Sequence, residues 1–204
     1  SAVIGHSVGE IAALHVAGAL ALEEAVRVVC ARGAIMQRAT GTGRMAAAGL
    51  SAAEAAALVE PFGHRLSVGA INSPHGVTLS GEAAALDEAL AMLDARGVSH
   101  RMLPVQYAFH SAQMAPFEQE LAAVLADLVW RAPDVPVYST VTGARADGVR
   151  FDGAYFGHNV RAAVKLAPAL DALIGDGVDL FVEIERKVVL ATSIADCLNA
   201  RGTE

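Results

Sequence analysis

Residues 44–105 alternate between strand-like and helix-like patterns, and this alternation leaves few possible folds. The six pieces read as strand, helix, strand, strand, helix and strand: MAAAGL, SAAEAAALVEPF, LSVGAINS, GVTLSG, EAAALDEALAMLDARG and SHRMLPV. Ser51 and Glu54 have the spacing of a capping box, which marks the start of the first helix. The order βαββαβ is that of a ferredoxin-like split βαβ unit. We therefore predict that residues 44–105 form a ferredoxin-like small subdomain inserted into a larger one.

The flanking residues 1–43 and 106–204 predict a larger, α/β-hydrolase-like subdomain. An apolar run at residues 2–4 precedes a helical pattern over residues 10–39, which breaks near Gly18 and restarts at Glu23 and Glu24. Later patterns predict a long helix over 112–130, a strand over 135–143, a helical region from Asp152, a buried strand over 179–185 and a closing helix. Together these elements would form a mainly parallel sheet covered by helices, so the predicted fold class is α/β.

Composition narrows the function classes. Of the 204 residues, 54% are hydrophobic and 18% charged, which fits a well-buried core. A net charge of -7 and a pI near 5.5 disfavour nucleic acid or an anionic membrane surface as the main partner. Cys30 and Cys197 cannot build a disulfide framework and lack metal-like neighbours, so we expect no metal site and a reducing cytoplasm. No apolar stretch reaches the roughly 20 residues that span a bilayer.

The stretch IGHSVGE at residues 4–10 is a candidate nucleophile site. Ser7 stands between Gly5 and Gly9, after a strand-like run and before a helical pattern. The pattern G-x-S-x-G at a strand-to-helix turn is typical of a nucleophile elbow, in which small neighbours allow a strained serine backbone. The alternative at this point is a chance pair of glycines at a tight turn.

A serine nucleophile needs a base, and the histidines differ in how well they fit that role. Four of them occupy ordinary helix, loop or strand-edge positions and are expected to be structural: His15, His64, His75 and His100. His6 adjoins Ser7, but its side chain should point away from that of the serine, which favours a packing or hydrogen-bonding role. His110, in VQYAFHS, follows the last strand of the predicted insertion. Loops at such a junction face the cleft between subdomains, so His110 is the candidate base.

Five ordered motifs carry a family resemblance: GHSVGE, ARGAIMQ, AINSPHGVTLSG, YAFHS and YFGHNVRAAVKL. Together they resemble the malonyl-type acyltransferase domains of modular polyketide synthases and the related malonyl-CoA:acyl carrier protein transacylases. The resemblance covers nearly the whole chain. It implies transfer of a malonyl extender unit from coenzyme A, through an acyl-serine, to the phosphopantetheine thiol of an acyl carrier protein. It implies no bound cofactor, and it implies malonyl-CoA, the acyl carrier protein and neighbouring synthase domains as partners.

The resemblance also assigns roles to residues. Ser7 would be the nucleophile, His110 the base in both half-reactions, and the Val8 N–H an oxyanion donor. The Asn159 main-chain carbonyl would orient the histidine. Arg32 would bind both oxygens of the malonyl carboxylate. From the residues alone, Arg32 could equally be a solvated helix residue like its neighbours Arg27 and Arg38.

Four side chains would line the specificity pocket: Val8, Met36, Tyr107 and Phe109. By the resemblance, Phe109 and Val8 favour malonyl, whereas Tyr107 is more typical of methylmalonyl-selecting members. A hydrophobic pocket discriminates one methyl group by only about 1–3 kcal/mol, so this hybrid motif leaves a methylmalonyl-selective or relaxed acyltransferase open as an alternative.

Two departures from the family pattern keep other functions open. The chain begins at the elbow strand, whereas the family has a preceding Gly-Gln-Gly segment that supplies a second oxyanion donor, so the chain is expected to be a fragment. The stretch VEIERKVVL stands where the family usually reads EIGPHPVL, which changes a turn. A catalytically inactive structural fragment is therefore one alternative. A serine esterase or thioesterase is another, although it would require neither Arg32 nor the inserted unit.

Overall fold

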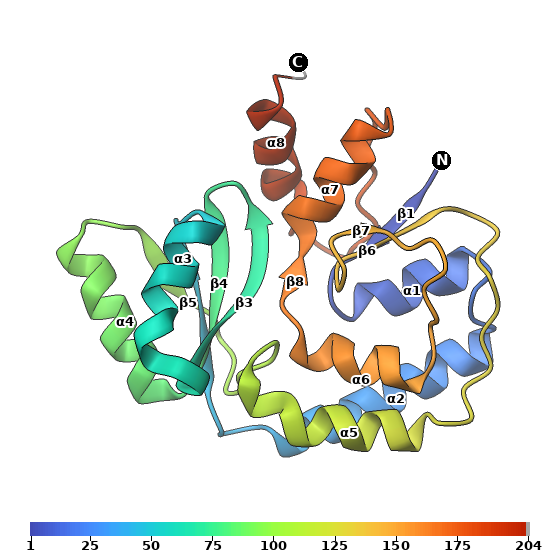
Figure 1. Ribbon diagram of the computed structural model, residues 1–204, viewed down its shortest axis with the longest axis horizontal. Coiled ribbons are helices and arrows are strands. Elements are labelled where there is room, and N and C mark those ends of the chain that lie inside the picture. The colour runs from blue at the N-terminus through green and yellow to red at the C-terminus, as the bar shows by residue number, and fades with distance from the viewer. Residues whose placement is uncertain (203–204) are drawn as a thin grey trace.

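The computed structural model describes residues 1–202 and contains two β-sheets. The smaller half of the molecule holds four antiparallel strands in the order β5-β2-β4-β3, which is the strand order of a ferredoxin-like unit. These strands are β2 (Arg44–Ala48), β3 (Leu66–Ser73), β4 (Gly76–Gly81) and β5 (His100–Met102). Helices α3 (Ala52–Val59) and α4 (Ala83–Ala95) lie along one face of this sheet (Figure 1). The predicted βαββαβ pattern is confirmed, and a 3₁₀ helix (Glu60–Arg65) links α3 to β3.

Local chemistry explains the accuracy of the prediction in this half. The Ser51 hydroxyl accepts from the Glu54 N–H at 3.3 Å, while the Glu54 carboxylate accepts from the Ser51 N–H at 2.9 Å, so the predicted capping box is present. Apolar residues from both helices and the sheet interlock in one core, in which Ala46, Leu79 and Leu86 are fully buried. The helices therefore need the sheet to bury their apolar faces.

A fifth strand joins this sheet from the distant end of the chain. Strand β8 (Val164–Lys165) pairs in parallel with β3, with Val164 opposite Ala70. Two residues carry no recognisable period, and so this strand was not predicted from the sequence. It connects the small sheet directly to the larger half of the molecule.

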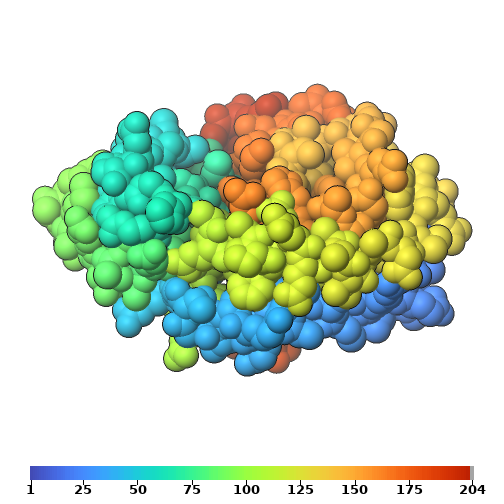
Figure 2. Space-filling model, turned by 60° about the horizontal axis from the view of Figure 1, so that its bottom comes forward, coloured from blue at the N-terminus to red at the C-terminus, as the bar shows by residue number. Residues whose placement is uncertain are grey.

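The larger half contains β1 (Val3–Gly5), β6 (Val137–Ser139) and β7 (Ala144–Arg145) in the order β1-β6-β7. The pair β1 and β6 is parallel, whereas β7 runs antiparallel to β6. Four helices pack around one core: α1 (Gly9–Val16), α2 (Leu22–Arg38), α5 (Ala115–Val124) and α6 (Gly153–Arg161). Figure 2 shows α2 and α5 running side by side along one face of the molecule. The predicted break near Gly18 falls between α1 and α2.

Two predicted elements differ from the structure. The helix expected over 112–130 is a 3₁₀ turn (Ala112–Met114) followed by α5, which ends at Val124. The buried strand expected over 179–185 is wrong, because this segment is irregular and Leu180, Val182 and Ile184 are 78%, 76% and 94% exposed. Their alternation favours a strand, but among residues 1–202 no neighbouring strand pairs with the segment. It connects α7 (Leu166–Gly175) to α8 (Ala191–Ala200), the closing helix.

The observed architecture is the predicted α/β class, with two sheets flanked by helices. The boundaries at residues 43/44 and 105/106 remain a prediction. Within residues 1–202, no helix has both the length and the apolar character that a membrane span requires.

Candidate active site

Ser7 lies in the turn between β1 and α1 with φ of 54°, in the left-handed region that side chains rarely adopt. Gly5 makes this turn possible, since a Cβ there would lie 2.3 Å from the Glu10 nitrogen. A Cβ on Gly9 would meet nothing within 4 Å. The first glycine of the motif is therefore required sterically and the second is not.

His110 has the same unusual backbone as Ser7, with φ of 58°. Within the described chain, these two residues are the only non-glycine residues with positive φ. The His110 N–H donates to the Val160 carbonyl at 3.0 Å, which holds the strained turn against α6. Strained backbones concentrate at functional sites, where the surrounding structure enforces them.

The two side chains meet directly, because His110 Nε2 lies 2.7 Å from Ser7 Oγ. On the other side of the ring, Nδ1 lies 2.8 Å from the Ala162 carbonyl oxygen. Since a carbonyl can only accept, Nδ1 carries the proton and Nε2 is free to accept from the serine. Burial, and next the charge of Arg32, lower the pKa of His110 from 6.5 to about 3. The imidazole is therefore neutral at neutral pH and can act as a base.

The residue expected to orient His110 requires a correction. The carbonyl that accepts from Nδ1 belongs to Ala162, whereas that of Asn159 makes a smaller contribution to the pKa of His110. The reason is that α6 ends at Arg161, and the extended backbone of Ala162 turns its carbonyl toward the ring. The side chain of Asn159 has a different role, which involves Arg32.

Arg32, on α2, is 3% exposed and points at Ser7. Its Nη2 donates to Ser7 Oγ at 2.9 Å, its Nη1 donates to Asn159 Oδ1, and its Nε lies 3.2 Å from Met36 Sδ. Burial lowers the pKa of Arg32 to about 10, which leaves the guanidinium charged at neutral pH.

Arg32 differs from the neighbouring arginines of α2 in its burial and in its partners. Arg27 is partly exposed and forms an ion pair with Asp127, and Arg38 is exposed and forms one with Glu120. Among the ion pairs of residues 1–202, none includes Arg32. Arg32 is therefore a buried cation beside the Ser7 hydroxyl, and a guanidinium in such a place has the geometry to bind a carboxylate.

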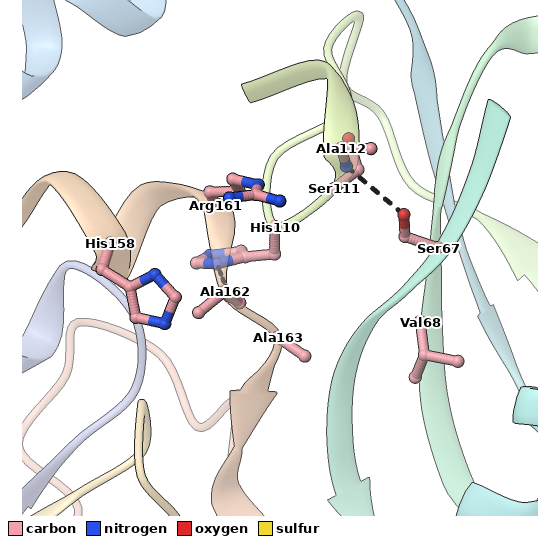
Figure 3. Close-up of a pocket in the computed structure, with 9 residues that line it drawn as sticks. All are labelled: Ser67, Val68, His110, Ser111, Ala112, His158, Arg161, Ala162 and Ala163. Atoms are coloured by element: carbon pink, nitrogen blue, oxygen red, sulfur yellow. Dashed lines mark hydrogen bonds between the residues drawn. The ribbon is translucent and has the colours of Figure 1, made fainter. Parts of the chain in front are cut away.

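A cleft of about 320 Å³ opens beside His110. Figure 3 shows Ser67 and Val68 of β3 on one side and, on the other, His158, Arg161, Ala162 and Ala163, with His110 between the two sides. A hydrogen bond of 3.4 Å from the Ala112 N–H to Ser67 Oγ crosses the junction. His110 therefore lies where the two halves of the molecule meet, as its position in the sequence predicted.

Comparison with known proteins identifies the family. A sequence model of the acyl transferase domain family matches residues 1–203. The chain belongs to this family. The spectinabilin polyketide synthase system protein NorC of Streptomyces orinoci is 42% identical over 204 residues, which cover 100% of this chain and 9% of that protein. Erythronolide synthase EryA3 of Saccharopolyspora erythraea is 40% identical, over 98% of this chain and 6% of that protein.

Comparison with solved structures gives the same family. The acyltransferase domain from module 8 of the salinomycin polyketide synthase superposes with a TM-score of 0.96 at 35% identity, over 98% of this chain and 48% of that one. A malonyl CoA-acyl carrier protein transacylase from Clostridium perfringens gives 0.89 at 26% identity, over 96% and 64%. This acyltransferase chain thus spans less than a tenth of the two curated relatives and about half of the salinomycin domain structure.

The two aromatic side chains of the YAFH motif stack on each other. The rings of Tyr107 and Phe109 are stacked, with centroids 3.8 Å apart and planes 19° apart. Both pack against the core of the larger half, as does Met36. Val8 is 51% exposed, and its N–H follows Ser7 at the start of α1, where the first amides of a helix lack partner carbonyls.

Sequence reasoning missed one buried acid of this acyltransferase site. Glu10 is 2% exposed, although an acidic residue in the first turn of a helix is usually solvated. Its presence in the quoted GHSVGE motif was the available signal. His6 has a structural partner, as expected: its Nε2 lies 2.9 Å from Asn72 Oδ1 on β3.

Proposed function

We propose that this chain loads a malonyl extender unit from coenzyme A onto the phosphopantetheine thiol of an acyl carrier protein, within a polyketide synthase. The observation that carries the proposal is the buried cation of Arg32, which forms no ion pair within residues 1–202 and lies 2.9 Å from the nucleophile oxygen of Ser7. Such a cation favours an acyl group with a terminal carboxylate and penalises an uncharged one.

In the first half-reaction, Ser7 Oγ attacks the thioester carbonyl and gives its proton to His110 Nε2. The Val8 N–H, at the positive end of α1, stabilises the oxyanion. The carbon–sulfur bond breaks, coenzyme A leaves as a thiol with the proton from His110, and malonyl-serine remains. Because Nδ1 is held by the Ala162 carbonyl, the ring stays in the orientation that both proton transfers require.

The second half-reaction uses the same groups in reverse. The phosphopantetheine thiol gives its proton to His110, its sulfur attacks the ester carbonyl, and Ser7 regains the proton as the acyl–oxygen bond breaks. Both thiol-bearing molecules are substrates, so no resident cofactor takes part. Malonyl-CoA, the acyl carrier protein and neighbouring synthase domains are the proposed partners.

Phe109 favours malonyl over methylmalonyl, although Tyr107, which stacks on it, is more typical of methylmalonyl-selecting members. Stacking holds the Phe109 ring in place, and by family analogy this ring fills the space beside the α-carbon of the acyl group. Because one methyl group is worth only about 1–3 kcal/mol, a relaxed enzyme that also accepts methylmalonyl is the second candidate.

The test is intact-mass spectrometry of the full-length natural protein after exposure to malonyl-CoA, with Ser7→Ala as its pair. We expect a stable malonyl adduct on the wild type and none on Ser7→Ala, with both variants folded. Free malonate without an adduct would indicate a hydrolase, and no reaction would indicate an inactive structural unit. Either result, or an adduct that persists in Ser7→Ala, contradicts the proposal. Adding methylmalonyl-CoA in competition separates the two specificities.

A further inference from the structure

The carboxylate of Glu10 lies behind the substrate-facing residues and is held by several hydrogen bonds. Oε1 accepts from the N–H of Thr140 and lies 3.1 Å from the Thr140 hydroxyl, whose one proton is also within reach of the Gly5 carbonyl at 2.9 Å. Oε2 accepts from the Tyr155 hydroxyl at 2.9 Å and from Asn159 Nδ2 at 2.8 Å. With this many donors, a buried carboxylate can stay ionised, although burial raises the pKa of Glu10.

Asn159 links this carboxylate to the guanidinium. Its Nδ2 donates to Glu10 while its Oδ1 accepts from Arg32 Nη1. A carboxylate can only accept, so it fixes which end of the amide faces it. The oxygen of Asn159 must then face Arg32, and it holds one guanidinium nitrogen while another reaches Ser7.

The amide also keeps the two charges apart. Glu10 supplies a negative charge that favours a protonated Arg32, and it raises the pKa of that residue against the effect of burial. No direct ion pair forms between them among the described residues. A directly paired carboxylate could occupy two guanidinium N–H groups, whereas the Asn159 oxygen accepts from Nη1 alone.

We propose that Glu10 is a positioning residue that acts through Asn159 to aim the Arg32 guanidinium at the acyl carboxylate beside Ser7. This inference rests on the proposed function, because it gives Glu10 a role in selecting carboxylated donors. It accounts for a buried acid that takes no part in either proton transfer.

The informative substitution is Glu10→Gln, which keeps the size of the side chain. A glutamine amide can donate as well as accept, so it no longer fixes the orientation of Asn159. Where the Asn159 amide reverses, its NH₂ group faces the guanidinium, two donors oppose each other, and Arg32 turns away. Binding of a carboxylated acyl group is therefore weakened, whereas binding of an uncharged acyl group is not.

Tyr155→Phe is the matched control. It removes the hydrogen bond to the same carboxylate and the 2.7 Å contact with the Ser139 hydroxyl, and it keeps the ring, which packs edge-on against Phe151 and Phe156. Glu10 keeps its bonds to Thr140 and Asn159, so the orientation of the amide is preserved. A general loss of stability in the hydrogen-bond network should appear in both variants. Misorientation of the Arg32 guanidinium should appear only in Glu10→Gln.

The experiment measures kcat and KM for malonyl-CoA and acetyl-CoA with the full-length natural protein and each variant, with thermal denaturation to confirm folding. We expect Glu10→Gln to reduce the malonyl-to-acetyl ratio of kcat/KM about tenfold to a hundredfold, mainly through the KM for malonyl-CoA. Tyr155→Phe should keep the wild-type ratio. In an Arg32→Ala background, Glu10→Gln should leave the ratio unchanged. If Glu10→Gln does not fold, Asn159→Ala takes its place, with the same loss expected.

Several results would overturn the inference: an unchanged ratio in Glu10→Gln, an equal fall with both donors, the same ratio change in Tyr155→Phe, or an undiminished effect without Arg32. A wild type that forms an adduct and prefers malonyl, combined with any of these results, refutes the role of Glu10 and leaves the proposed function intact. A wild type that forms no adduct or prefers acetyl refutes both.

Discussion

At the scale of single residues, the charge state of His110 has the largest effect on the proposed reaction. Its ring is 6% exposed and lies between Ser7 and the Ala162 carbonyl. Desolvation, and then the nearby Arg32 cation, disfavour the imidazolium and bring the pKa to about 3.

This shift predicts an unusual pH profile. In the free enzyme His110 stays neutral well below its usual pKa, so kcat/KM for malonyl-CoA should show no acid limb due to this residue between about pH 5 and pH 8. A steady-state pH profile checks this prediction. A tenfold loss per pH unit below about 6.5 would show that the imidazole titrates normally.

Stability gives an independent check with a defined sign. The folded chain resists protonation of His110, whereas the unfolded chain takes up the proton near pH 6.5. The neutral imidazole therefore adds stability above pH 6.5 that is lost as the pH falls from 6.5 toward 3. Denaturant titrations of the wild type and His110→Gln should show that the wild type loses more stability over this range.

At the scale of elements, the elbow between β1 and α1 makes a prediction about its two glycines. Gly5→Ala should unfold or strongly destabilise the protein, because the added Cβ would lie 2.3 Å from the Glu10 nitrogen and 2.4 Å from its Cα. Gly9→Ala should fold normally and gain up to about 1 kcal/mol, because its Cβ meets nothing and alanine favours helices. Thermal denaturation of the pair decides this. Equal destabilisation would mean that both glycines are needed sterically.

Helices and strands whose pattern and ends are both marked by nearby residues could be predicted from the sequence. Strands β3 and β4 begin and end at the predicted residues, because alternating or continuous apolar runs are bounded there by turn residues. The segment 179–185 has an alternating pattern but no strand beside it among the described residues, and so the pattern failed. Strand β8 depends entirely on the neighbouring β3, and two residues cannot signal that.

Some residues of the candidate site could likewise be predicted from the sequence, and others could not. Ser7 and His110 were candidates from the sequence pattern and position, and Arg32 was named through the family resemblance. In the structure the Ser7 hydroxyl lies within hydrogen-bonding distance of both His110 and Arg32. The Ala162 carbonyl was missed because it depends on where α6 ends. Glu10 was missed because burial, and not residue type, distinguishes it from a solvated helix acid.

The whole molecule brings these parts together through the junction of its two halves. Strand β8 adds to the small sheet, His6 contacts Asn72 across the junction, and the cleft beside His110 is lined from both sides. In Figure 1 the small sheet with α3 and α4 forms one lobe, and the helices around β1 and β6 form the other. Ser7 and Arg32 come from the larger lobe, so the proposed selection for a carboxylate depends on a cation that this lobe buries.

The most direct measurement of that selection is a competition between malonyl-CoA and acetyl-CoA, on the wild type and Arg32→Ala, in the full-length natural protein. The proposal predicts that the wild type prefers malonyl and that the substitution inverts the preference. Malonyl transfer should fall strongly, because its carboxylate loses a charge-assisted partner, while acetyl transfer is unchanged or rises once the buried cation is gone. An equal fall with both donors would contradict the account, because Arg32 would then support the fold without recognising the carboxylate.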